Sequence, residues 1–284
     1  MKILIFGISG MLGNTLFRYL SLESGHEVFG TIRSDRAPIN SRLEHSSKIM
    51  TEVDAENQDS LENMFSIIRP DVVINCIGHI KQLDLSEDPL VVLPINSLLP
   101  HKLARLCKLS DSRLIHISTD CVFSGDQGDY KESDYSDAKD LYGKSKYLGE
   151  VNYSHCITLR TSIIGHEIDR NIALIDWFLS QKGPVKGYKN AIFSGLPTVE
   201  LARVIMNYVL PRSDLFGLYH VASNPINKYD LLKMVANVYE KDIQIIDDET
   251  VKINRSLNAK RFNEVTGYMP PDWFTLIKKM HDFG

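Results

Sequence analysis

The chain has 284 residues, of which 43% are hydrophobic and 24% are charged, and its formal net charge is −4. These values are typical of a globular protein with a large core, folded as one large domain or two small ones, and they argue against disorder. Because the net charge is slightly negative, neither nucleic acid nor an anionic membrane is expected as a partner. No apolar stretch approaches the roughly 20 residues that a membrane-spanning helix needs.

The cysteines indicate a reducing compartment. There are four, widely spaced and without a CxxC pair: Cys76, Cys107, Cys121 and Cys156. A chain of this length does not need disulfides, so free thiols are expected. Glycines interrupt the apolar run at the N-terminus, which argues against a signal peptide. A cytoplasmic location is therefore predicted.

Short apolar runs alternate with amphipathic segments in the first half of the chain, as in repeated βα units around a parallel sheet. The expected strands are residues 2–7, 27–32, 71–78, 113–118 and 156–161. The expected helices are residues 11–23, 57–68, 86–108 and 140–152. Three prolines within 86–108 predict that this helix is kinked or broken. The predicted fold class is α/β, with a Rossmann-type doubly wound parallel sheet.

The alternation loosens after residue 165. Helices are expected at 174–181, 197–210 and 227–240, with Thr198 as a candidate N-cap, and a short strand is expected at 217–222. We therefore expect a cofactor-binding Rossmann domain at 1–165. Residues 166–284 are expected to form mainly a smaller substrate-binding lobe, with segments around 190–222 returning to the Rossmann core.

A glycine loop follows the first expected strand and opens the first helix. Without side chains, a pyrophosphate can approach the backbone, and the helix N-terminus offers free N–H groups. A tight turn without a ligand is the alternative, but the position after the first strand favours a dinucleotide site. The loop residues predicted to contact the cofactor are Gly7, Ser9, Gly10, Met11, Leu12 and Gly13.

The end of the second strand predicts which dinucleotide binds. An NAD site usually has a carboxylate there for the ribose 2′-hydroxyl, whereas this chain has Arg33, followed by Ser34 and Arg36. A cation suits a 2′-phosphate, so NADP(H) is preferred and NAD(H) is the second candidate, unless Arg33 is simply solvated. Asp54, after a presumed third strand near 51–57, is predicted to accept from the adenine amino group or to cap the next helix.

Three Tyr-xxx-Lys pairs are candidates for a proton donor and its cation: Tyr135 with Lys139, Tyr142 with Lys146, and Tyr229 with Lys233. A lysine one helical turn from a tyrosine places its ammonium on the same face, where it can stabilise a phenolate. Asp140 is a good N-cap directly before Tyr142, whereas Tyr135 lies in a polar run typical of a loop. The helix boundary therefore favours Tyr142 and Lys146.

The strand at 113–118 ends in Ser118, Thr119 and Asp120, at the carboxyl edge where open α/β sheets bind ligands. The sequence STDCVFSG at 118–125, the sequence YGKSK at 142–146 and the glycine loop together resemble the extended short-chain dehydrogenase/reductases. Within these, the chain resembles the dTDP-4-dehydrorhamnose reductase group, over nearly its whole length.

The resemblance implies a catalytic triad of Thr119, Tyr142 and Lys146. It implies NADPH-dependent reduction of a nucleotide-activated 4-keto-6-deoxy sugar, in deoxysugar or cell-surface polysaccharide biosynthesis, and a homodimer. Besides Arg33, Ser34, Asp54 and the triad's Tyr142 and Lys146, the expected cofactor contacts are Cys76, Ile77, Gly78, Asn96, Ser118 and Arg160. The expected substrate contacts are His79, Lys81, Thr119, Asp120, Val122 and Arg255, and no metal site is expected.

Two other functions stay open. One is a sugar-nucleotide epimerase or dehydratase that retains NAD(P), although a dehydratase would usually have a glutamate where Cys121 follows Asp120. The other is a non-catalytic NADP-binding regulatory subunit. The triad positions are all filled with chemically competent residues, which favours an enzyme.

Overall fold

The computed structural model describes residues 1–34 and 48–284. Its centre is a parallel seven-stranded sheet in the order β11-β6-β5-β4-β1-β2-β3. The strands are β1 (Lys2–Phe6), β2 (Glu27–Thr31), β3 (Ile49–Met50), β4 (Val72–Asn75), β5 (Arg113–Thr119), β6 (Cys156–Thr161) and β11 (Gly217–His220). This topology is the doubly wound Rossmann type, which confirms the predicted fold class.

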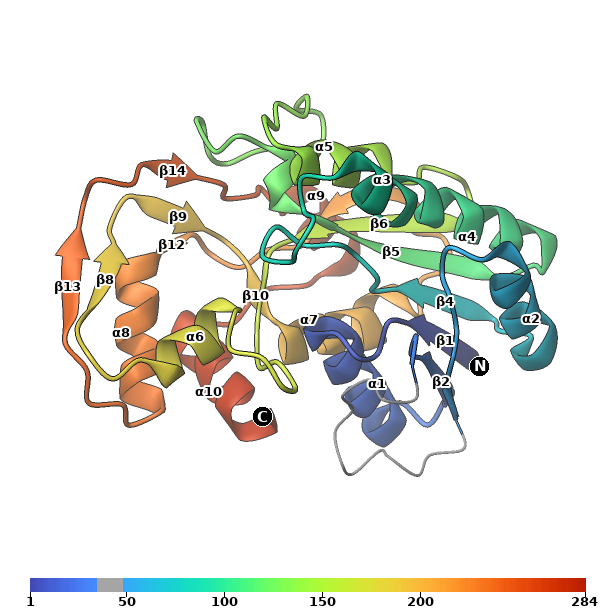
Figure 1. Ribbon diagram of the computed structural model, residues 1–284, viewed down its shortest axis with the longest axis horizontal. Coiled ribbons are helices and arrows are strands. Elements are labelled where there is room, and N and C mark those ends of the chain that lie inside the picture. Colours follow the sequence, from blue (N-terminus) through green and yellow to red (C-terminus); the bar gives the residue numbers. More distant parts are fainter. Residues whose placement is uncertain (35–47) are drawn as a thin grey trace.

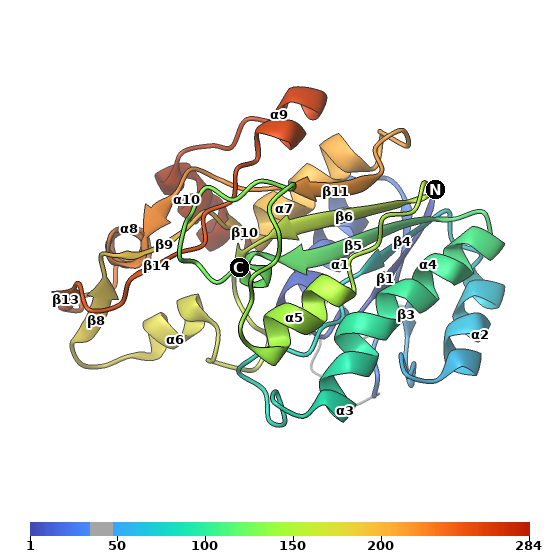
Figure 2. The same cartoon turned by 90° about the horizontal axis from the view of Figure 1, so that it is seen from above.

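Helices cover both faces of this sheet (Figures 1 and 2). They are α1 (Met11–Glu23) and α7 (Thr198–Val204) on one face, and α2 (Gln58–Ile68), α4 (Leu99–Leu109) and α5 (Leu141–Leu148) on the other. Successive side chains of β1 alternate between two cores: Ile3 and Ile5 pack on the α1 side, whereas Leu4 and Phe6 pack on the α2 side. This is why the strand reads as a continuous apolar run.

The expected helix at 86–108 is interrupted as its prolines predict. It consists of α3 (Pro89–Leu93), a π-helical turn (Pro94–Leu98) and α4, and the Leu99 N–H bonds to the carbonyl of Pro94. π-Turns inside helices are rare and are frequent at functional sites. Asn96 lies in this turn and is fully buried.

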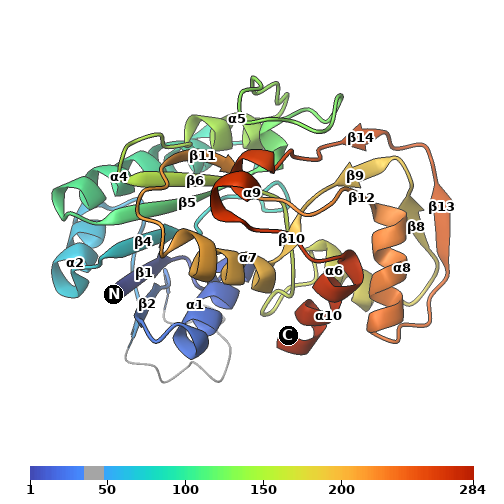
Figure 3. The same cartoon turned by 180° about the vertical axis from the view of Figure 1, so that it is seen from behind.

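The rest of the chain forms a smaller lobe beside the carboxyl ends of the large sheet's strands (Figures 1 and 3). Its helices are α6 (Leu174–Ser180), α8 (Lys228–Val238) and α10 (Trp273–Phe283). Its small sheets pair β12 (Ile226–Asn227), β9 (Ala191–Phe193) and β14 (Ile253–Asn254), and β13 (Ile245–Asp248) with β8 (Val185–Tyr188). Buried side chains of this lobe join the core on the α1 side of the large sheet.

Parts of the segment 190–222 return to the large sheet. β11 extends it beside β6, and α7 with its π-helical continuation (Ile205–Val209) packs on α1, whereas β9 belongs to the lobe. The short strands β7 (Ile163–Ile164) and β10 (Leu196–Pro197) pair with each other, and α9 (Lys260–Thr266) packs on β11. No helix in the described ranges is both long and apolar enough to cross a membrane.

Two local predictions were wrong. Thr198 does not cap its helix: α7 begins at Thr198 itself, whose hydroxyl instead accepts a hydrogen bond from Thr15 Oγ1 at 3.0 Å. The third strand lies at Ile49–Met50, before the segment 51–57, so Asp54 is in the loop that follows it.

Candidate active site

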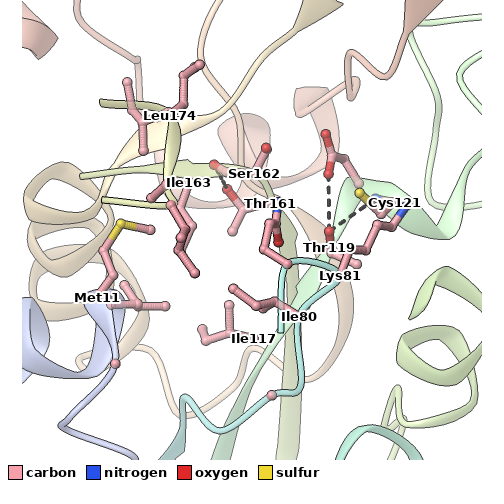
Figure 4. A pocket seen from close by; sticks show the side chains of 18 of the residues that line it. Met11, Ile80, Lys81, Ile117, Thr119, Cys121, Thr161, Ser162, Ile163 and Leu174 are labelled. Carbon is pink, nitrogen blue, oxygen red and sulfur yellow. Dashed lines mark hydrogen bonds between the residues drawn. The ribbon is translucent and has the colours of Figure 1, made fainter. Parts of the chain in front are cut away.

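A cavity of about 660 Å³ opens at the carboxyl ends of β1, β4, β5 and β6, between the large sheet and the lobe. In Figure 4, Met11 and Leu174 lie on one side of this cavity and Lys81, Thr119 and Cys121 on the other. Its size is in the range of small-molecule sites, and its place at the strand ends is where open α/β sheets bind ligands.

The glycine loop forms one end of the cavity. Gly7 has a φ of +88°, and a Cβ there would lie 2.8 Å from Ile77 Cγ1. A Cβ on Gly13 would lie 2.8 Å from the carbonyl carbon of Gly7, so α1 can approach the loop only without that side chain. Neither Gly7 nor Gly13 lines the cavity; they shape the loop, and Ser9, Gly10, Met11 and Leu12 line it.

The loop after β4 forms the next wall, where Cys76, Ile77 and Gly78 line the cavity. Asn96 holds this loop from behind: its Oδ1 accepts from the His79 N–H at 2.8 Å, and its Nδ2 donates to the His79 carbonyl at 2.9 Å. Nδ2 also donates to Ser145 Oγ at 3.1 Å. Asn96 does not line the cavity, so the structure does not support direct cofactor contact and gives it a positioning role.

The end of β5 brings hydroxyl, carboxyl and thiol groups to the wall of the cavity. Thr119 Oγ1 donates to Asp120 Oδ1 at 3.1 Å and accepts from the Cys121 N–H at 3.1 Å. Asp120 is 5% exposed, and burial raises its pKa, although the charge of Arg255 lowers it. Ser118 also lines the cavity and donates to Glu150 Oε1 at 2.7 Å.

Helix α5 carries Tyr142 and Lys146 against this edge, and both line the cavity. The helix begins as predicted, because Asp140 accepts from the Gly143 N–H at 2.8 Å. Gly143 is required where it stands, since a Cβ there would lie 2.6 Å from the Ala138 Cβ. Tyr135, in contrast, is 90% exposed in a loop.

Burial controls the charge of both α5 side chains. It raises the pKa of Tyr142 well above the usual value, with the charge of Cys121 acting in the same direction and the Thr119 hydroxyl opposing it. Burial lowers the pKa of Lys146 to about 8, and the Lys146 ammonium donates to the Ile117 carbonyl at 2.8 Å. Desolvation is the largest cause of the Tyr142 shift, so the phenol is held in its neutral form.

Arg160 requires a correction. It is 2% exposed and does not line the cavity. Its Nε and Nη2 donate to the two Glu150 carboxylate oxygens, each at 2.6 Å, and its guanidinium lies over the Phe123 ring at 5.2 Å. Arg160 is thus a buried structural ion pair behind the site, and the adjacent residues Thr161 and Ser162 reach the cavity instead.

The remaining predicted cofactor residues lie at the end of β2 and in the loop before α2. Arg33 and Ser34 are exposed at the carboxyl end of β2, outside the cavity, and Arg36 lies outside the described residues. Asp54 is exposed, and its Oδ1 accepts from the Glu56 N–H at 2.9 Å. Since Asn57 caps α2, the capping role proposed for Asp54 was wrong.

The predicted substrate residues divide into two groups. Lys81, Thr119, Asp120 and Arg255 line the cavity. Val122 does not, because it is fully buried in a small cluster with Phe123. The His79 ring is also outside the cavity, with Nε2 3.0 Å from the Asp84 carbonyl oxygen. Contacts of Val122 and His79 side chains with substrate are therefore not supported.

Other lining residues were not predicted. They come mostly from the lobe, and they include Glu167, Arg170, Phe193 and Lys228. Lys228 is the first residue of α8, directly after its N-cap Asn227. Asn227 is a recognisable N-cap in the sequence, so the start of α8 could be predicted. No local pattern indicates that Lys228 lines the cavity.

A neutral buried phenol, a threonine hydroxyl and a lysine lie around one cavity whose other end is a glycine loop at a helix N-terminus. This combination of fold and site defines an NAD(P)-dependent oxidoreductase of the extended short-chain dehydrogenase/reductase type. The chain belongs to the family described as "RmlD substrate binding domain", whose model matches residues 1–281.

Similar proteins agree with this family. The chain is 23% identical over 309 aligned residues to a dTDP-4-dehydrorhamnose reductase of Aggregatibacter actinomycetemcomitans, covering 99% of both chains. It is also similar to the crystal structure of dTDP-4-dehydrorhamnose reductase from Bacillus anthracis in complex with NADP, with a TM-score of 0.81, 19% identity, and coverage of 100% and 99%. It is 23% identical over 252 residues to methionine adenosyltransferase 2 subunit beta of Danio rerio, covering 84% of this chain and 74% of that protein.

Proposed function

We propose that this protein is an NADPH-dependent reductase of a nucleotide-activated 4-keto-6-deoxy sugar, in deoxysugar or cell-surface polysaccharide biosynthesis. The observation that carries the proposal is the shared cavity: Thr119 and Tyr142 line it together with the glycine-loop residues Ser9 to Leu12. The similarity to dTDP-4-dehydrorhamnose reductases over the full chain supports the substrate class.

The residues around the cavity fit a dinucleotide. Ser9, Gly10 and Met11 would receive the pyrophosphate at the N-terminus of α1, where the Gly10 N-cap has no side-chain cap. Arg33 and Ser34 would meet the 2′-phosphate, which favours NADP(H) over NAD(H), in line with the NADP named for the Bacillus anthracis relative. When bound, the cofactor supplies the hydride.

Tyr142 would donate the proton that the emerging alkoxide needs. Burial keeps this phenol protonated, so it has a proton to give, and an alkoxide is a strong enough base to take it. Thr119 would turn its hydroxyl from Asp120 to the substrate oxygen and orient the carbonyl. Lys146 would hold the nicotinamide ribose and place a positive charge behind the phenol as its proton leaves. Cys76, Ile77, Gly78 and Ser118 would border the nicotinamide half.

The organisation of the chain follows from these roles. We propose that 1–165 form the cofactor domain, and that 166–284 form mainly the substrate lobe, apart from α7, β11 and α9, which pack on the core.

A cytoplasmic homodimer is proposed from the resemblance. The similarity to the beta subunit of methionine adenosyltransferase 2 keeps a regulatory role as the rival, but the cavity and the filled triad favour catalysis.

The test is NADPH oxidation by purified protein with a panel of 4-keto-6-deoxy sugar nucleotides. We expect loss of NADPH absorbance with at least one of them, and release of NADP⁺ at each turnover. No turnover with any of them, where a reductase control works, would contradict the proposal. A protein that purifies with cofactor retained and converts sugar nucleotides without net NADPH loss would instead be an epimerase or dehydratase.

A further inference from the structure

A turn in the segment between β4 and α3 forms part of the cavity wall. It comprises residues 80–83, all of which line the cavity, and its Leu83 N–H bonds to the Ile80 carbonyl at 3.1 Å. The backbone just before the turn is fixed, because the buried Asn96 bonds to both the N–H and the carbonyl of His79. The position of the turn itself therefore depends on what its own side chains bind.

Lys81 fastens this turn to the start of helix α5. Its ammonium donates to Asp140 Oδ2 at 2.6 Å, and in the described parts of the chain no other group of the turn makes a hydrogen bond or ion pair with a residue outside it. The other Asp140 oxygen caps the helix, because Oδ1 accepts from the Gly143 N–H at 2.8 Å. A single carboxylate therefore begins the helix that carries Tyr142 and anchors the turn beside it.

The Lys81 ammonium also lies over the candidate proton donor. The distance from its Nζ to the centre of the Tyr142 ring is 5.5 Å, within the range at which a cation is attracted to an aromatic face. Figure 4 shows Lys81 on the same side of the cavity as Thr119 and Cys121. One ammonium thus faces both the start of the helix and the ring that the helix carries.

The charge of Asp140 disfavours the phenolate that Tyr142 becomes when its proton leaves. Burial is the largest cause of the raised pKa of Tyr142, and the carboxylate of Asp140 adds to it. Burial also acts to raise the pKa of Asp140, but the Gly143 N–H and the Lys81 ammonium outweigh it and lower that pKa, so the carboxylate is ionised at neutral pH. Because Lys81 pairs with this carboxylate, it offsets the repulsion at the phenol.

We infer that Lys81 is a positioning residue of the reductase: its ion pair with Asp140 holds the turn against α5, and its ammonium orients the Tyr142 ring and offsets the Asp140 charge. The inference rests on the proposed function, which makes Tyr142 the proton donor. It gives Lys81 a partner inside the protein, in place of the substrate contact expected from the sequence. The two side chains of the pair are 34% and 35% exposed, so the effect is modest and needs a matched control.

The experiment compares variants of the full chain by turnover, ligand binding and hydrogen exchange. Lys81→Met keeps the stem of the side chain and removes the charge, whereas Lys81→Arg keeps the charge. Asp140→Asn removes the partner charge and keeps a good N-cap. The matched control is Lys139→Met, which breaks the exposed pair with Asp126 next to the same helix start. The readouts are kcat and KM with NADPH and an accepted sugar nucleotide, the Kd for UDP and dTDP, and backbone exchange of residues 80–83.

We expect Lys81→Met to lower kcat roughly 5- to 20-fold, because an ion pair and a cation–π contact are both lost. KM and the Kd for UDP and dTDP should change less than about twofold, since no substrate contact is removed. Exchange of residues 80–83 should become roughly two- to fivefold faster. Lys81→Arg should stay within about threefold of the wild-type kcat, because arginine also pairs with a carboxylate.

The double variant Lys81→Met with Asp140→Asn should be no slower than Lys81→Met alone, because the two changes remove one shared interaction. Lys139→Met should behave like the wild type. Additive losses in the double variant would overturn the inference, as would an equal loss in Lys139→Met.

Two further outcomes would also overturn it. A raised Kd for UDP and dTDP in Lys81→Met, with kcat unchanged, would make Lys81 a phosphate contact. Wild-type hydrogen exchange of residues 80–83 in Lys81→Met would show that the pair does not hold the turn. The proposed function fails separately: a wild-type protein that oxidises NADPH with no sugar nucleotide refutes the reductase, and the exchange result still decides whether Lys81 fastens the turn.

Discussion

Gly13→Ala is predicted to damage cofactor binding much more than folding. The new Cβ would lie 2.8 Å from the carbonyl carbon of Gly7, closer still to its oxygen, and 3.0 Å from Ile8 Cα. All three are backbone atoms, so no side-chain rotation can relieve the contact. To bring the Gly7 oxygen to ordinary van der Waals distance, the loop and α1 must separate by more than about 1 Å.

Two effects of Gly13→Ala on the free energy of unfolding partly offset each other. Overpacking of this kind costs about 1–3 kcal/mol. Alanine gains about 1 kcal/mol over glycine inside a helix. The net destabilisation is therefore roughly 0–2 kcal/mol, a fall in Tm of at most several degrees for a chain of this size. The displaced loop, however, includes Ser9 and Gly10, which line the cavity.

We expect the Kd for NADPH to rise roughly 10- to 100-fold, since misplacements of this size have such effects on positioned ligands. Calorimetry gives the Kd, and thermal unfolding gives the Tm. The control is Gly183→Ala, whose Cβ would meet nothing within 4 Å and whose φ is not positive. Equal NADPH affinity of Gly13→Ala and Gly183→Ala would refute the claim that the close approach of α1 to the glycine loop is required for cofactor binding.

Three further results are expected. Glu150→Gln should destabilise the fold by roughly 3–5 kcal/mol in urea unfolding, because it leaves the buried Arg160 charge unpaired. The exposed pair Arg212–Asp214 is the comparison, and a Glu150→Gln cost as small as that of Asp214→Asn would refute the structural role. The rate at limiting NADPH should fall as pH rises through about 8, because the Lys146 ammonium is lost there while Tyr142 stays neutral. Lys146→Arg should remove that alkaline limb, and its persistence would assign the limb elsewhere. Tyr135→Phe should change kcat less than twofold, since that phenol is 90% exposed, and a large loss would reopen the choice of tyrosine.

Local sequence signals predicted the helices and turns that carry the glycine loop and the Tyr142–Lys146 pair. Asp140 does cap α5, which places Tyr142 and Lys146 on a helix and leaves Tyr135 in a loop. The glycine loop follows β1 and opens α1 with the expected bounds. These features depend on neighbours within a few residues, so the chain's local pattern contains the information.

Predictions failed where distant partners decide. The resemblance places Arg160 among the cofactor contacts, but it is paired with Glu150, which follows the end of α5. Val122 follows the strand-end cluster in sequence yet turns into a buried cluster with Leu257. Lys228 lies more than a hundred positions from Thr119 in the sequence, and only the packing of the lobe brings it to the cavity.

The most direct test of the central claim is the turnover of Tyr142→Phe with NADPH and an accepted 4-keto sugar nucleotide. The variant lacks only the phenol oxygen that would supply the proton. We predict that kcat falls by roughly 10²- to 10⁴-fold, the range for loss of a general acid, while the Kd for NADPH stays within about twofold of the wild type. Wild-type turnover in Tyr142→Phe would contradict the assignment of Tyr142 as the proton donor.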